Sequence, residues 1–151
     1  MHKYAVRPAQ LEDIQWMLPQ LENFSDFYGT HHQLFGTAES SAQVVQFMIE
    51  KHVVFVCERS DVGPIGFISG FVNPHIYNPD MNVLTEAWWW VLPEFRGTKA
   101  GLLLLNSFTE WGKENVDWIT FALPHHSPAN DACLLRRGYK LQEKTFLLEI
   151  T

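Results

Sequence analysis

Apolar positions recur along the chain with helical spacing in some segments and strand spacing in others, and this pattern predicts most of its elements. Residues 4–7 form a short strand candidate. Apolar side chains then follow at helical spacing from Leu11 to Leu21, although Pro19 is expected to kink or end that helix. Residues 23–37 are irregular, which predicts a loop or a loosely helical segment.

The middle of the chain predicts a helix followed by a hairpin. Ser40, with Gln43 three residues later, is a capping-box signal for a second helix. Residues 52–57 are a nearly unbroken run of β-branched and aromatic side chains, which is typical of a buried central strand. A turn joins this strand to another over residues 65–72, where small residues indicate a bulge or close packing: Gly66, Ser69 and Gly70.

A polar loop over Asn73–Asn82 leads into the most aromatic strand of the chain, Val83–Leu92, which includes three consecutive tryptophans. The segment after it has its apolar side chains on one helical face. A fifth strand is expected over residues 117–123.

The C-terminal part predicts one more helix and two strands. Ser127 as N-cap and Pro128 at the first position start the helix, and Gly138 ends it. Residues 139–142 and 145–150 are the last strand candidates. The resulting order, β-α-α-β-β-β-α-β-α-β-β, predicts one α/β domain over residues 1–151, with a mixed sheet and helices on both faces.

Composition fits a globular protein with an aromatic core. Hydrophobic residues make up 46% of the chain, with six Trp and eleven Phe, and the formal net charge is −6. An acidic chain without basic patches argues against nucleic-acid binding. The apolar runs are too short to span a bilayer and the N-terminus lacks a signal peptide, so we expect a cytoplasmic protein without a membrane partner. Cys57 and Cys133 are isolated, which predicts two buried thiols.

The turn between the aromatic strand and its helix has the features of an anion site. Small residues at a helix N-terminus present unpaired backbone N–H groups, and the helix dipole adds positive potential there. Arg96, Thr98 and Lys99 add two cations and a hydroxyl. The constellation suits a pyrophosphate, although an ordinary strand–helix connection would use similar residues.

This segment, Pro93–Leu105, resembles motif A of the GNAT superfamily of N-acetyltransferases. Arg96 matches the first position of the family's [R/Q]xxGx[G/A] pattern and Gly101 the last, whereas Lys99 stands where the family usually has Gly. Arg137-Gly138-Tyr139 looks like the family's "GF" ending of the last helix, and the order of elements also agrees. The resemblance implies a mostly antiparallel sheet that is splayed between its fourth and fifth strands.

The resemblance further implies acetyl-CoA as acyl donor and a primary amine, on a small molecule or a protein, as acceptor. The backbone of the fourth strand's end would bind the pantetheine, and the turn would hold the pyrophosphate. The amine would enter from the opposite side, near the 23–37 and 73–82 loops. The implied cofactor-binding residues are Trp90, Val91, Leu92, Arg96, Gly97, Thr98, Lys99, Ala100, Gly101 and Leu102.

Glu86 is the candidate general base, since it is the acidic residue inside the fourth strand, where burial would raise its pKa. Strand alternation places it on one face with Trp88 and Trp90. A Glu at a strand edge that is only hydrogen-bonded or exposed is the alternative. The family's catalytic Tyr would fall at Leu134, so no acid is assigned, and Ser127 replaces an Asn that commonly contacts the cofactor, with Asn130 one turn further on.

Two histidine pairs, His31-His32 and His125-His126, lack partners at metal-ligand spacing, so no metal site is expected. A proton-transfer role for His125 or His126 is a further hypothesis. Three functional readings stay open: an N-acetyltransferase, a protein that binds acyl-CoA with little or no turnover, and a structural module without a CoA site. The sequence leaves the oligomeric state open, a homodimer included.

Overall fold

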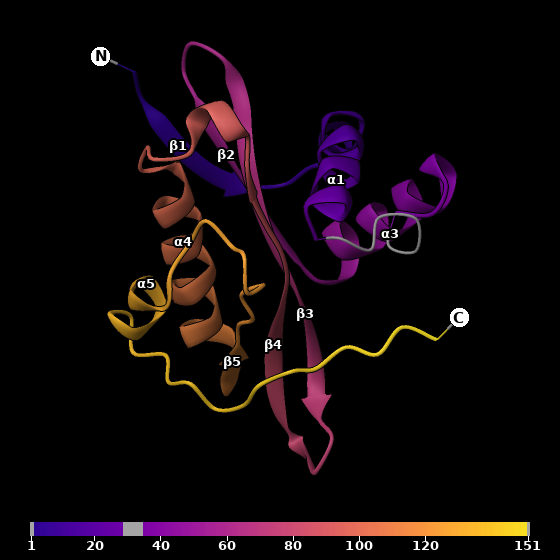
Figure 1. The fold of residues 1–151 in the computed structure, drawn as a ribbon, viewed down its shortest axis with the longest axis vertical. Coiled ribbons are helices and arrows are strands. Elements are labelled where there is room, and N and C mark those ends of the chain that lie inside the picture. Colours follow the sequence, from indigo (N-terminus) through magenta and orange to yellow (C-terminus); the bar gives the residue numbers. More distant parts are fainter. Residues whose placement is uncertain (1, 29–34, 151) are drawn as a thin grey trace.

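The computed structural model describes residues 2–28 and 35–150, and it places a five-stranded sheet between two sets of helices (Figure 1). The strands lie in the sheet in their order along the chain. Every neighbouring pair is antiparallel except the last, which is parallel. The strands are β1 (Tyr4–Pro8), β2 (Val53–Arg59), β3 (Gly63–His75), β4 (Asn78–Val91) and β5 (Trp118–Thr120).

Helices cover both faces of this sheet, as the pattern predicts (Figure 1). One face carries α1 (Ile14–Tyr28), which follows the 3-10 turn η1 (Leu11–Asp13), and α3 (Ala38–Lys51). The other face carries α4 (Ala100–Asn115), reached through the 3-10 turn η2 (Pro93–Phe95), and the short α5 (Asp131–Leu135). Within the described parts of the chain, no helix is long and apolar enough to cross a membrane.

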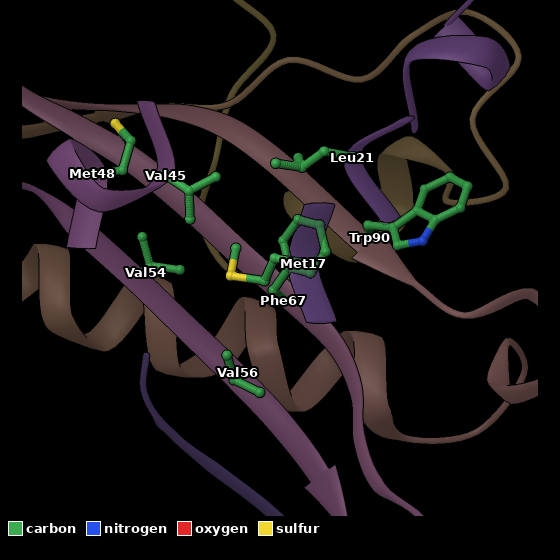
Figure 2. Close-up of a cluster of buried hydrophobic side chains, with 8 residues drawn as sticks. All are labelled: Met17, Leu21, Val45, Met48, Val54, Val56, Phe67 and Trp90. Carbon is green, nitrogen blue, oxygen red and sulfur yellow. The ribbon is translucent and has the colours of Figure 1, made fainter. Parts of the chain in front are cut away.

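Two hydrophobic clusters hold the layers together. The first lies between the sheet and helices α1 and α3, and Figure 2 shows its buried members: Met17, Leu21, Val45, Met48, Val54, Val56, Phe67 and Trp90. The second lies under α4, with Leu84, Leu104 and Phe108 fully buried. The central strands β2, β3 and β4 therefore contribute side chains to both cores, which is why the apolar runs of β2 and β3 are nearly continuous.

The N-terminal helices begin and end elsewhere than predicted. α1 continues through Pro19 to Tyr28, because proline removes one helical hydrogen bond while Phe24 and Phe27 still gain burial against the first cluster. The N-cap of α3 is Thr37, whose side chain accepts a hydrogen bond from the backbone N–H of Ser40 at 3.0 Å. The capping box therefore starts three residues before the predicted one.

The predicted 73–82 loop is wrong. β3 and β4 continue through this segment as a long hairpin, and only Ile76 and Tyr77 form its turn. Figure 1 shows this hairpin projecting from the body of the molecule, at the end opposite the start of α4. The polar residues that suggested a loop lie in the hairpin arms, where a two-stranded ribbon leaves side chains solvated.

The two C-terminal strands predicted over residues 139–142 and 145–150 are also absent from the structure, where this segment has no regular secondary structure. Its apolar side chains are exposed, with Phe146 at 88% and Ile150 at 83% of their full accessibility. Strand propensity depends on a pairing partner. β5, the edge strand of the sheet on this side, is only three residues long and pairs with β4 alone among the described strands.

A partly buried ion pair ties β1 to the 3-10 turn η1 that precedes α1. Both terminal nitrogens of Arg7 donate to the Asp13 carboxylate at 2.8 Å, and the Gln10 backbone N–H donates to the same carboxylate at 2.7 Å. The Arg7 hydrogen bonds hold the pKa of Asp13 below its usual value. A carboxylate with a lowered folded-state pKa stabilises the fold above its unfolded pKa, and this contribution is lost as the pH falls through the folded value.

Asp13→Asn should therefore lower the free energy of unfolding at pH 7 by about 2 kcal/mol, because it leaves a partly buried guanidinium with one fewer anion. The matched control is Asp61→Asn, which makes the same chemical change in the exposed Arg59 pair and should cost far less. Urea unfolding at pH 7 and pH 3 measures both, and the Asp13 effect should shrink at pH 3. Equal losses for the two variants at pH 7 would contradict this assignment.

Candidate functional site

The sheet opens between β4 and β5, and this opening forms a large cavity. The β4–β5 ladder covers only Val83–Thr85 against Trp118–Thr120. Beyond it, residues 86–91 of β4 pair with β3 alone. The cavity of about 1800 Å³ reaches from α1 through this opening to the start of α4 and the 121–139 segment. The splay that the sequence resemblance implies is confirmed.

The end of β4 offers its backbone to this opening. The backbone N–H of Leu92 donates to the carbonyl of Ile65 at 2.9 Å, so these two residues form a hydrogen-bonded pair of the β3–β4 ladder. Hydrogen-bonded and non-bonded pairs alternate in antiparallel strands. Val91, paired with Gly66, therefore turns its N–H and C=O away from β3 and toward the splay. An extended amide chain would find a donor and an acceptor there.

A bulge in β4 decides where Glu86 points. Ser69 of β3 pairs with Trp88, and the next residue, Gly70, pairs with Glu86, so that Ala87 is the extra residue. The small residues in β3 predicted a bulge or close packing, and the register shift confirms it. A β-bulge reverses the alternation of side chains beyond it.

Glu86 consequently lies on the α4 face of the sheet. A Cβ atom added at its partner Gly70 would lie 2.9 Å from Cδ1 of Leu84, in the cluster under α4. Paired residues of antiparallel strands point to the same face. The prediction that Glu86 shares a face with Trp88 and Trp90 is wrong, because those tryptophans contact the opposite cluster and the extra residue separates them from Glu86.

Glu86 lines the cavity and is partly buried in its wall. Burial raises the pKa of Glu86 to about 8, and the backbone N–H of Ala122 opposes this shift. Loss of water disfavours the charged form of a carboxyl group, so the direction follows from the location. A carboxyl group with this pKa exchanges protons near neutral pH, which is what a general base requires.

Tyr139 shares the cavity wall with Glu86, although its residue type and spacing predict no functional role. Its hydroxyl lies 2.8 Å from Oγ1 of Thr109 in α4, and its ring packs edge-on against Phe121. Burial raises the pKa of Tyr139, and the charge of Glu86 acts in the same direction. The sequence feature that could have indicated Tyr139 is its place directly after Gly138. This glycine has a positive φ, ends the helical turn and directs the chain back toward α4.

The turn before α4, residues 97–102, presents free backbone N–H groups, and we call it the cradle. In the part of the chain that the structure describes, four N–H groups of this turn find no acceptor, those of Gly97, Lys99, Gly101 and Leu102. α4 is a helix of 16 residues, so its dipole adds to their potential. Gly97 has a φ of +84°, a left-handed conformation that favours glycine. Ala100 is fully buried and anchors the first turn.

Lys99 does not distort this cradle. Its φ of −76° and ψ of −2° are ordinary right-handed values, so the usual glycine is not required there. Its Nζ lies 5.1 Å from the ring centroid of Tyr4, which draws the side chain toward β1. The Thr98 hydroxyl donates to the Phe95 carbonyl at 2.6 Å and accepts from the Ala100 N–H. Both side chains therefore shape the turn in this structure.

The Arg96 side chain lies on the α1 face of the sheet, opposite the face that carries α4. Its guanidinium stands 4.5 Å from the ring centroid of Trp90 and 5.8 Å from that of Phe27, two members of the α1 side of the core. Its Nε donates to the Val91 carbonyl at 3.0 Å. Arg96 thus faces the α1 mouth of the opening, while the N–H cradle faces α4.

The histidine and asparagine candidates have structural partners. Nε2 of His126 lies 2.6 Å from the Phe27 carbonyl, and its ring packs on that of Phe27 at 4.6 Å. Asn130, not Ser127, caps α5 through the Ala132 N–H. His31-His32 lies outside the described residues. Over residues 2–28 and 35–150, no group of three or more His, Cys, Asp or Glu side chains is placed to hold a metal, and both cysteines are free.

Comparison with known proteins places this geometry in a family. Residues 15–139 match the model of the acetyltransferase (GNAT) family. No curated protein matches the chain at a significant level. A putative acetyl transferase from Pyrococcus furiosus is similar at 18% identity and a TM-score of 0.75, covering 98% of this chain and 100% of its own. A Trypanosoma brucei acetyltransferase has 15% identity, a TM-score of 0.74 and coverages of 98% and 100%.

A predicted acetyltransferase from Clostridium acetobutylicum, solved with acetyl-CoA, has 14% identity and a TM-score of 0.74, over 99% of this chain and 96% of that one. These likenesses are to the fold, whereas the family model matches the sequence itself across most of its length. The chain is a member of the GNAT acetyltransferase family.

Proposed function

We propose that this protein transfers the acetyl group of acetyl-CoA to a primary amine. One observation carries the proposal: β4 separates from β5, with a free helix N-terminus on one side of the opening and the partly buried Glu86 in its wall. The cradle residues 97–102 would hold the pyrophosphate, and the backbone of Trp90, Val91 and Leu92 would position the pantetheine. The family match and the acetyl-CoA in a similar structure support the choice of donor.

The reaction that this site supports is direct attack. The free amine nitrogen bonds to the thioester carbonyl carbon, the C–S bond then breaks, and the sulfur leaves as the CoA thiolate with the bonding electron pair. Glu86 takes the proton that the nitrogen loses, directly or through a water, and water protonates the thiolate. The protein's largest contribution is to hold the two reactants together in a partly desolvated cavity.

The second candidate is a protein that binds acetyl-CoA with little turnover. The Arg96 hydrogen bond to Val91 favours it, because that carbonyl is the acceptor that the pantetheine would use. Leu134 in place of the family's Tyr points the same way. For turnover, Arg96 Nε would have to exchange its partner when the donor binds.

A panel of amines assayed for acetyl-CoA-dependent release of free thiol, with the products identified by mass spectrometry, separates the two candidates. Transfer to at least one amine above the uncatalysed rate is the expected result. Acetyl-CoA binding without any acetylated product across the panel would instead favour the binding protein.

A further inference from the structure

The cation at the α1 mouth of the opening has no anion of its own. Arg96 is partly buried, and in residues 2–28 and 35–150 it forms no ion pair with a carboxylate. Residues 29–34, which follow α1, contain no Asp or Glu. Burial lowers the pKa of Arg96 and the nearby Glu94 raises it only in part. A guanidinium remains charged in this setting, so it leaves a binding capacity for an anion.

The guanidinium is also held in place. Its Nε is used by the Val91 carbonyl and its plane is covered by Trp90, which itself donates from Nε1 to Oε1 of Gln20 at 3.0 Å. The two terminal nitrogens have no partner in the same residue ranges. They form the fork that binds a carboxylate in a bidentate manner. Stacking on Trp90 keeps the guanidinium at this mouth even when Nε exchanges its partner on donor binding, so Arg96 is positioned as a carboxylate receptor.

The walls around Arg96 describe the rest of the ligand. Phe24 and Phe27 of α1 both stand 6.0 Å from Trp90, centroid to centroid, and line the cavity with His126. These rings are apolar and leave little room for a charged side chain without a partner. The face lies across β4 from the cradle, so it is the side that an acceptor would use if acetyl-CoA occupies the cradle.

We propose that the acceptor is an amine that carries a carboxylate group and an apolar or aromatic body, as an apolar α-amino acid does, with Arg96 binding the carboxylate. This rests on the proposed function and names the substrate class of the same site. In this proposal Arg96 binds the acceptor's carboxylate and not the pyrophosphate, which is the ligand that the sequence resemblance implies for it.

Matched pairs of amines with and without the carboxylate test this: phenylalanine with 2-phenylethylamine, tryptophan with tryptamine, and leucine with 3-methylbutylamine. Rates are corrected for the free-amine fraction at each pH. In the wild type we expect the carboxylated member to have kcat/KM at least about tenfold higher, the size of one charge-assisted hydrogen bond. Arg96→Gln should abolish this preference, mainly through KM, without lowering the affinity for acetyl-CoA, since it frees the Val91 carbonyl.

Arg96→Lys is the conservative control, and it should recover part of the preference because it restores the charge without the fork. Equal kcat/KM for both members of each wild-type pair would overturn the inference, as would an Arg96→Gln variant that loses acetyl-CoA affinity while keeping its amine preference. Acetylation confined to amines without a carboxylate would do the same. Failure of every amine, with or without the carboxylate, would instead count against the proposed function.

Discussion

Glu86→Gln should lower the rate of acetyl transfer by about 10²- to 10³-fold while leaving acetyl-CoA affinity nearly unchanged. The effect is large because a positioned base removes the proton that the attacking nitrogen must lose. Glutamine keeps the shape of the side chain and cannot accept that proton as a carboxylate does. Steady-state kinetics with one acetylated amine, together with calorimetric binding of acetyl-CoA, measures the two quantities separately.

The pH dependence gives the sharper form of the same test. Only the ionised form of Glu86 can act as base, so the wild-type rate, corrected for the free-amine fraction, should rise with pH through an inflection near the pKa of about 8 and level off above it. The variant should lack this inflection. An unchanged profile in Glu86→Gln would show that another group titrates, and the assignment of Glu86 as base would then be wrong.

Two controls protect this experiment. Glu110→Gln makes the same charge change on an exposed side chain of α4 and should leave the rate unaltered. A buried carboxyl with a raised pKa opposes folding as the pH rises from the unfolded value, near 4.3, to about 8. Glu86→Gln should therefore melt at least as high as the wild type at pH 8.5, which excludes unfolding as the cause of lost activity.

Gly101→Asp should weaken acetyl-CoA binding by at least about 100-fold. The substitution puts a negative charge in the first turn of α4, where two like charges about 4 Å apart repel by about 4 kcal/mol at an effective dielectric of 20. The fold should tolerate it, because an added Cβ would lie 3.7 Å from its nearest neighbours, Trp89 and Val91. An acidic residue near a helix N-terminus also stabilises the helix.

Gly101→Asn is the matched control for size. It has nearly the volume of Asp without the charge, so the difference between the two dissociation constants isolates the electrostatic part. Titrations at low and moderate salt should bring the two variants closer together as salt rises. Equal affinities for Asp and Asn at low salt would mean that no phosphate lies at this turn.

Sequence patterns predicted those parts of the fold that depend on neighbouring residues alone. The β2–β3 hairpin follows from strand propensity and α4 follows from helical periodicity. The turn at Gly138 follows from the backbone freedom of glycine. The 73–82 segment and the C-terminal strands were misread because a strand exists only with a partner. Composition made the hairpin arms look like a loop, whereas β3 and β4 pair through them. The tail had strand-like composition, and no strand of the described residues pairs with it.

The candidate site also has one part that the sequence predicts and one part that it does not. Backbone features were predictable, since small residues at a helix start expose N–H groups whatever their side chains do. Side-chain directions were not. One extra residue at Ala87 moves Glu86 to the α4 face, and the rings of Trp90 and of Phe27, the latter from the sequence-distant α1, draw Arg96 to the opposite side. Such effects depend on tertiary contacts that a single sequence does not display.

The central claim is that the opening between β4 and β5 binds acetyl-CoA through the cradle before α4. Calorimetric titration of the wild-type protein with acetyl-CoA, beside S-acetyl-N-acetylcysteamine, a thioester without the pyrophosphate, tests it most directly. We predict saturable binding of one acetyl-CoA per chain, at least about 100-fold tighter than the truncated thioester, since the cradle contacts only the missing part. No binding of acetyl-CoA at millimolar concentration, or equal affinity for both thioesters, would contradict the claim.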